Sequence, residues 1–134
     1  MKKLLFIIAA MLFSMSIDAQ TIYDEHNSSC GYIYSDGRVL NGSHSTIGKF
    51  DGRRIANSSN ATTGYIEGST FYNSSHSSVG SISGETVYNS SHSSIGRIAS
   101  DGTVYNSYNH SIGKARGIKK EWVAVFFFFP QLLR

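Results

Sequence analysis

The stretch TVYNSSHSSIG at residues 86–96 decides the fold, because the chain repeats it. Near copies read TFYNSSHSSVG at residues 70–80 and RVLNGSHSTIG at residues 38–48. Aligned on its closing glycine, the phrase occurs six times, at spacings of 17, 16, 16, 16 and 17 residues. The six closing glycines are Gly31, Gly48, Gly64, Gly80, Gly96 and Gly113. Such a period indicates a repeat architecture.

Each repeat predicts two short antiparallel strands. One strand precedes the Asn-Ser-Ser-His turn, at residues 87–89 in the copy quoted above, and the other follows the turn at residues 94–98. Pairs such as Asp36-Gly37 and Asp101-Gly102 then lead to the next copy, and such pairs are a strong hairpin signal. Serine, asparagine, glycine and β-branched residues dominate without a 3.6-residue period, so we expect an all-β domain.

Two architectures fit these hairpins. A β-solenoid with 16 residues per coil would need parallel stacking and capped ends. A closed ring uses the tight turns directly and leaves no exposed sheet edge. The phrase occurs six times and the linking segment five times, as expected if the first and last half-units complete one another. We therefore expect a closed, shallow antiparallel barrel of five repeated hairpins over residues 20–117.

Three columns of apolar residues keep register with the glycines and predict the core. The first precedes each turn and consists of Ile22, Val39, Ile55, Phe71, Val87 and Val104. The second directly precedes each glycine and consists of Cys30, Ile47, Thr63, Val79, Ile95 and Ile112. The third lies two residues after a glycine and consists of Ile33, Phe50, Ile66, Ile82 and Ile98. The second and third columns differ in strand parity, so a β-bulge or close backbone approach is expected at glycines such as Gly96.

The last segment, residues 118–134, departs from the repeat. Its sequence IKKEWVAVFFFFPQLL is apolar on all sides after a charged start, which predicts burial, and it is too short to cross a bilayer. We favour a short helix over about residues 120–129, ended by Pro130, that plugs the centre of the barrel. A closing strand is the alternative, because phenylalanine and valine favour strands. Insertion into a membrane surface is a third option.

The first residues resemble a secretory signal peptide. Lys2 and Lys3 precede an apolar run at residues 4–13, and small and polar residues follow up to Ala19. We expect residues 1–19 to be removed on export to the periplasm, the cell envelope or the medium. The formal charge of +3 is too small to indicate a nucleic-acid partner. Cys30 is the single cysteine and is expected to be a buried, inert thiol without a disulfide.

The histidines and serines of the phrase are interpreted as turn residues. Asparagine is a poor substitute for histidine on zinc, whereas both residues are common at positive φ. No carboxylate recurs beside the serines to complete a catalytic triad. We therefore expect no catalytic residue, metal site or cofactor, and no enzyme. The position four residues before each glycine holds Asn27, His44, Asn60, His76, His92 and Asn109.

Two other groups of residues are candidates for binding. Tyr23, Tyr72, Tyr88 and Tyr105 form a stripe expected to be partly exposed, where the rings would stack on sugars or pack across strands. A basic cluster precedes the apolar tail and is interpreted either as a solvated entry to the plug or as a lipid-facing end. With the neighbouring aromatic residue, this second group consists of Lys114, Arg116, Lys119, Lys120 and Trp122.

The export signal, the unit G-x-I-x-x-G-x-V-Y-N-S-S-x-x-x-I and the tryptophan–phenylalanine tail together resemble the five-fold β-flower proteins, over residues 21–129. These are small exported bacterial proteins, and the resemblance implies a symmetric antiparallel barrel with a hydrophobic centre. The outline is similar to the Tubby-type barrel, which holds a hydrophobic helix, and this favours the plug. The resemblance brings no functional residue.

The leading hypothesis is a non-enzymatic binding module for a membrane lipid or an apolar small molecule at the cell envelope. A structural or protein-interaction role in the envelope and weak carbohydrate binding are the alternatives.

Overall fold

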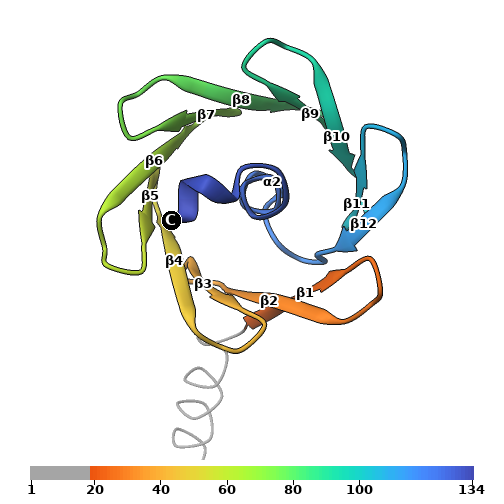
Figure 1. The fold of residues 1–134 in the computed structure, drawn as a ribbon, viewed down its shortest axis with the longest axis horizontal. Helices are drawn as coiled ribbons and strands as arrows, with labels where there is room; N and C mark the ends of the chain where they lie inside the picture. The colour runs from red at the N-terminus through yellow and green to blue at the C-terminus, as the bar shows by residue number, and fades with distance from the viewer. Residues whose placement is uncertain (1–18) are drawn as a thin grey trace, which may run out of the picture.

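The computed structural model describes residues 19–134 as a closed barrel of twelve antiparallel strands (Figure 1). The predicted signal peptide, residues 1–19, lies outside the described residues except for Ala19, where β1 begins. The strands are β1 (Ala19–Asp24), β2 (Ser29–Tyr34), β3 (Arg38–Asn41), β4 (Thr46–Asp51), β5 (Arg54–Asn57), β6 (Thr62–Glu67), β7 (Thr70–Asn73), β8 (Ser78–Ser83), β9 (Thr86–Asn89), β10 (Ser94–Ile98), β11 (Thr103–Asn106) and β12 (Ser111–Lys114).

The prediction of an all-β closed antiparallel barrel is confirmed, but the prediction of five hairpins is wrong. Each of the six phrases forms a complete hairpin, or petal, and the first and last petals meet where β1 pairs with β12. The first phrase has Asp24 where the others have asparagine, and its carboxylate forms the same turn. Asp24 Oδ1 accepts the N–H groups of His26 and Ser28 at 2.9 and 3.0 Å.

The petal turns are held by side-chain to backbone hydrogen bonds. In the petal quoted first, Asn89 Oδ1 accepts the N–H groups of Ser91 and Ser93 at 2.9 and 3.0 Å. His92 donates its N–H to the Asn89 carbonyl at 3.0 Å and has a φ of 63°. Asparagine and histidine tolerate this left-handed conformation better than most residues. The prediction that His92 and its five equivalents are turn residues is confirmed, since all six have a positive φ.

A β-bulge precedes the glycine in each petal. In the fifth petal the register between β9 and β10 shifts between Ser94 and Gly96, which confirms the expected irregularity there. The first column is fully buried, and most of the third column is buried too, extended by Ala115 in a sixth copy. The second column lies only partly buried against the core. The expectation of a buried Cys30 is therefore wrong in degree: this thiol is half-buried.

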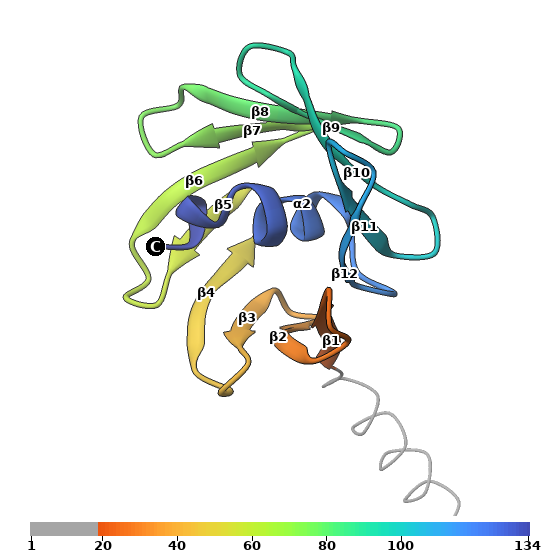
Figure 2. The ribbon, with the colours of Figure 1, turned by 45° about the vertical axis from the view of Figure 1, so that its right-hand side comes forward.

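The C-terminal segment is helical, so the expectation of a helix is confirmed and the closing strand is wrong. Helix α2 (Lys120–Phe128) is followed by the 3₁₀ helix η1 (Pro130–Leu133). Within residues 19–134, no helix has the length and hydrophobicity needed to cross a membrane. Helix α2 lies inside the ring of strands (Figure 1), with β5 and β6 on one side and β10 and β11 on the other (Figure 2). The buried residues of this segment are Val123, Ala124, Val125, Phe129, Leu132 and Leu133.

The barrel has two chemically different rims. Because neighbouring strands are antiparallel, the turns within petals lie at one end and the turns between petals lie at the other. We call these ends the Asn-turn rim and the Gly-turn rim. The turns of the Gly-turn rim contain glycines at positive φ, such as Gly84 at 60° and Gly102 at 91°.

Candidate functional site

The centre of the barrel is occupied by side chains of the C-terminal segment, one against each repeat glycine. A Cβ atom built on Gly31 would lie 2.5 Å from Phe126 Cζ, and one on Gly80 would lie 2.4 Å from Phe129 Cζ. No residue larger than glycine fits at such distances unless its neighbours move. Taken round the ring from β2 through β12 to β4, the pairs are Gly31–Phe126, Gly113–Phe127, Gly96–Phe128, Gly80–Phe129, Gly64–Leu132 and Gly48–Leu133.

The order of these pairs follows the order of the petals round the ring. Tail residues that follow one another in sequence contact petals that follow one another round the ring, so the segment makes one circuit of the interior. At Gly113 the barrel wall itself also excludes a side chain. A Cβ atom on Gly113 would lie 2.5 Å from the Tyr23 carbonyl oxygen.

The predicted basic cluster lies around the entry of the chain into α2, but it is not one patch. Lys120 Nζ donates to the Gly84 carbonyl at 2.9 Å, which ties the start of α2 to the Gly-turn rim. Lys119 Nζ lies 5.3 Å from the centroid of the Trp122 ring, and that ring stacks on Phe50 at 5.0 Å and 5°. The cluster is divided among three grooves.

Two of these grooves flank Ile118 at the Gly-turn rim, and we call them the α2 grooves. The larger has a volume of about 700 Å³, with the apolar residues Ile98 and Ala115 on its wall and the cations Arg116 and Lys120 beside them. The smaller has a volume of about 230 Å³ and is lined by Ile33, Ile118, Lys119 and Trp122 among others. Each α2 groove therefore combines apolar surface with a basic side chain.

The acidic residues of the larger groove are engaged by other groups. Asp101 accepts the Thr103 N–H at 3.0 Å, and this hydrogen bond holds the pKa of its carboxyl below the usual value, with Lys114 and Arg116 adding to the effect. Glu85 Oε1 lies 3.6 Å from Arg97 Nη1. Arg116 has no direct hydrogen bond or ion pair within the part of the chain that the structure describes, and its charge acts on Asp101 only at longer range.

The third groove lies at the seam between β1 and β12, and we call it the seam groove. It has a volume of about 470 Å³, and it contains Lys114 together with Arg116. Lys114 is therefore separate from Lys119 and Lys120, although all three lie within seven residues of sequence. The chain leaves the barrel wall after Ala115, and this exit directs the basic side chains on either side of it to different surfaces.

The Asn-turn rim carries an apolar surface that the sequence analysis missed, because an all-apolar tail was expected to be fully buried. Phe126, Phe127 and Phe128 are only partly buried there. A small groove of about 200 Å³ adjoins them, between Ile47 and the end of the chain. The second column is likewise only partly buried against the core, and its members Cys30, Ile47, Val79, Ile95 and Ile112 add apolar surface to the wall.

Of the predicted tyrosine stripe, Tyr72, Tyr88 and Tyr105 are partly exposed, as expected, and Tyr23 is exposed. Tyr72 stacks on His76 at 5.1 Å between centroids, and Arg97 lies 4.0 Å from the centroid of the Tyr105 ring.

Other outward tyrosines also contact turn histidines. His44 stacks on Tyr32 at 4.3 Å between centroids, and His76 lies 4.6 Å from Tyr65. His76 Nε2 also lies 2.9 Å from the Glu67 carboxylate. His44 and His76 thus contact the preceding petal, a role that the spacing of the phrase did not indicate.

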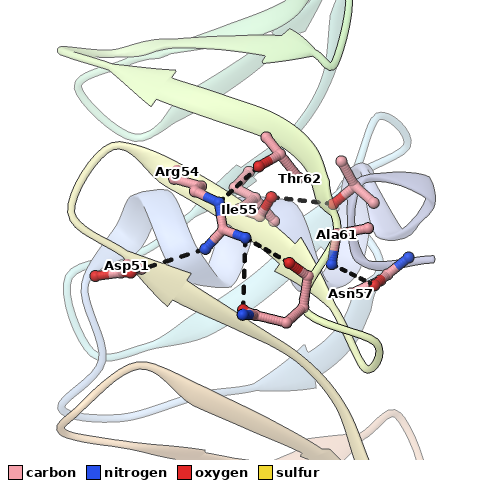
Figure 3. Close-up of polar contacts among 8 residues, drawn as sticks. Asp51, Arg54, Ile55, Asn57, Ala61 and Thr62 are labelled. Carbon is pink, nitrogen blue, oxygen red and sulfur yellow. Dashed lines mark hydrogen bonds and ion pairs between the residues drawn. The ribbon is translucent and has the colours of Figure 1, made fainter.

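Polar side chains in the third petal make a similar network on the outer face of the barrel (Figure 3). Arg54 Nε donates to Thr62 Oγ1 at 2.6 Å, and Arg54 Nη2 donates to the Asn60 carbonyl at 2.6 Å. Thr63, which takes the place of isoleucine in the second column, has its hydroxyl within hydrogen-bond distance of the carbonyls of Ile55 and Leu132. This threonine links the petal to the C-terminal segment.

Comparison with known proteins gives a family. No curated protein and no solved structure matches the chain. A family model described as 5-fold beta-flower protein matches residues 19–130, which include all twelve strands and α2. The barrel of this chain nevertheless has twelve strands in six petals. The chain belongs to the 5-fold β-flower protein family.

Proposed function

We propose that this protein is an exported, non-enzymatic binding module that binds an apolar or lipid ligand at the cell envelope through the α2 grooves. The observation that carries the proposal is the pairing of apolar walls with basic side chains on both sides of Ile118. Acyl chains would lie along Ile98, Ala115 and Ile118, because burial of apolar surface is favourable. An anionic headgroup would lie at the ammonium and guanidinium groups.

The contacts of Trp122 support a lipid-facing role for this rim. Trp122 is partly exposed, stacks on Phe50 and lies beside Lys119. Aromatic rings beside cations are typical of surfaces that bind anionic membranes, where each Lys or Arg near the surface contributes about 1 kcal/mol. The proposed ligand therefore includes anionic lipid in a membrane.

We also propose that the C-terminal segment acts as a plug on which the barrel depends for stability. Its side chains occupy the positions above the six repeat glycines, and its residues include six of the buried core. Deletion of residues 122–134 should therefore abolish cooperative thermal unfolding. A deletion variant that melts cooperatively at the wild-type temperature would contradict the plug.

Vesicle co-sedimentation tests the lipid proposal. Wild-type protein should pellet with phosphatidylglycerol-containing vesicles and stay in solution with pure phosphatidylcholine. The variant Lys119→Glu/Lys120→Glu should lose binding by roughly 30-fold, because two cations worth about 1 kcal/mol each are lost. The control Lys49→Glu/Arg134→Glu changes the net charge equally, but Lys49 lies on β4 and Arg134 lies beside Ile47.

Two outcomes would refute the lipid proposal. If the wild type stays in the supernatant with both kinds of vesicle, the protein does not bind anionic lipid. If the control loses as much binding as the Lys119/Lys120 variant, the attraction follows net charge and not the α2 grooves. Circular dichroism should first show that both variants fold, because Lys120 contacts the Gly84 carbonyl.

A structural or protein-interaction role in the envelope is the second candidate, and the Asn-turn rim favours it. The partly exposed rings of Phe126, Phe127 and Phe128 form an apolar surface beside turns that are rich in serine, of which the first also carries Asp24 and Glu25. A partner protein would cover this rim. Loss of partner capture in Phe127→Ser, with vesicle binding retained, would favour this role over lipid binding.

A further inference from the structure

We propose that the outer edge of β1, at residues 20–22 of the mature chain, is a docking site for an extended acidic peptide, which would add to the barrel wall as a further strand. The proposal concerns the seam groove and is independent of lipid binding at the α2 grooves. It rests on an incomplete strand pairing, on a groove beside it and on the charge of that groove.

The pairing of β1 is complete on one side and incomplete on the other. On the side of β2 the register runs from Ala19↔Tyr34 to Ile22↔Gly31. On the side of β12 it contains only Tyr23↔Lys114 and Asp24↔Gly113. Within residues 19–134, the first four residues of β1 therefore have a ladder partner on one side only.

The cause is the exit of the chain from the wall. Strand β12 ends at Lys114. The Ala115 N–H still donates to the Gly102 carbonyl, as the equivalent residue does in other petals, and the chain turns towards α2 beyond it. At an ordinary junction between petals, such as that of β8 and β9, pairing continues from Gly80↔Asn89 to Ser83↔Thr86. Unpaired N–H and C=O groups on a strand edge are a template for another strand.

A groove lies along this edge. The seam groove, of about 470 Å³, is lined by Ala19, Gln20 and Thr21 of the edge itself, and by Tyr23 and Asn27. Ala19 and Gln20 are exposed, and Thr21 is half-buried. An extended peptide laid in this groove would pair its backbone with β1, as in strand addition, and its side chains would alternate between the groove and solvent.

The charge of the groove selects the peptide. Lys114 and Arg116 are the charged residues among those that line it, and neither has a hydrogen-bond or ion-pair partner in the described range. The nearest carboxylate on β1, Asp24, accepts two N–H groups of its own turn. The Asp101 carboxylate lies near enough to both cations for each to lower its pKa, so one carboxylate faces two cations. Acidic side chains on every second residue of a peptide would add to this attraction.

Fluorescence anisotropy with a labelled decapeptide of alternating valine and glutamate tests the proposal on the chain from Gln20 onwards, preceded by an initiator methionine, which keeps all twelve strands. The glutamate peptide should bind at least about tenfold more tightly than a lysine counterpart. A counterpart N-methylated at alternate amides should not bind, because it lacks the ladder donors. Hydrogen exchange should slow at Gln20 and Thr21 when the glutamate peptide binds.

Charge reversal supplies the matched variants. Lys114→Glu/Arg116→Glu should reverse the preference in favour of the lysine peptide, and Lys49→Glu/Arg134→Glu should keep the wild-type preference. Equal binding of the N-methylated peptide, protection confined to other strands, or unchanged preference after charge reversal would each overturn the proposal. So would a concentration-dependent dimer that protects Gln20 and Thr21 without peptide, since the edge would then belong to a second copy.

Discussion

Replacement of Phe129 by alanine should strongly destabilise the barrel. Phe129 is 3% exposed, and its ring lies 5.1 Å from that of the fully buried Phe71. Its Cζ also lies over Gly80, so the wall has no side chain that could move into the space left by the ring. Removal of a buried phenylalanine ring costs about 3–5 kcal/mol, out of a total of about 5–15 kcal/mol for an ordinary domain.

Urea and thermal unfolding, followed by circular dichroism, measure this loss. A decrease of about 10–25 °C in Tm is expected for a domain of this size. The control is Tyr108→Ala, because Tyr108 is 81% exposed and its removal should change the free energy of unfolding by less than about 0.5 kcal/mol. A loss below about 1 kcal/mol for Phe129→Ala would show that the tail is not packed as described.

Three further changes test the turns and the thiol. The Arg38 N–H bonded to Asp36 holds the pKa of that carboxyl below its usual value. The stabilisation from this hydrogen bond is therefore present above about pH 4 and is lost as the pH falls through the folded-state pKa. In urea titrations the free energy of unfolding of Asp36→Asn should fall less steeply with acid than that of the wild type, and an equal fall would contradict this. Burial raises the pKa of the Cys30 thiol, so iodoacetamide should label it more slowly than free cysteine at pH 8, and equal rates would refute the packing of this residue. His92→Asn should change the free energy of unfolding by less than about 0.5 kcal/mol, whereas His92→Val should lose about 1–2 kcal/mol at a φ of 63°, and equal stability of the two variants would contradict the turn assignment.

The strands and turns could be predicted because they depend on residues close in sequence. The period, the turn residues and the fully buried first column all follow from the repeated phrase. The number of petals was predicted wrongly because the five linking segments were counted as the units, and the first and last phrases were taken as half-units that complete one another. Asp24 accepts the same two N–H groups as the asparagine of the other turns, so the first petal closes by itself.

The binding surfaces could be predicted only in part, because they depend on where separate segments meet. The composition of the tail predicts burial, but it does not show that Phe126 lies on Gly31 or that three phenylalanine rings reach the Asn-turn rim. The basic residues are close in sequence, yet the exit of the chain at Ala115 distributes them over three grooves. The unpaired edge of β1 has no signal in the sequence of β1 itself.

The central claim is that each repeat glycine receives one particular side chain of the tail, and a double-mutant cycle on Gly31 and Phe126 tests it most directly. A Cβ on Gly31 would lie 2.5 Å from Phe126 Cζ and 3.0 Å from the nearest backbone oxygen, so most of the clash is with that ring. Gly31→Ala should therefore cost at least about 1 kcal/mol less in the Phe126→Ala background than in the wild type, and it should be additive within about 0.5 kcal/mol with Phe128→Ala. Additivity in both cycles would contradict the order in which the tail occupies the ring.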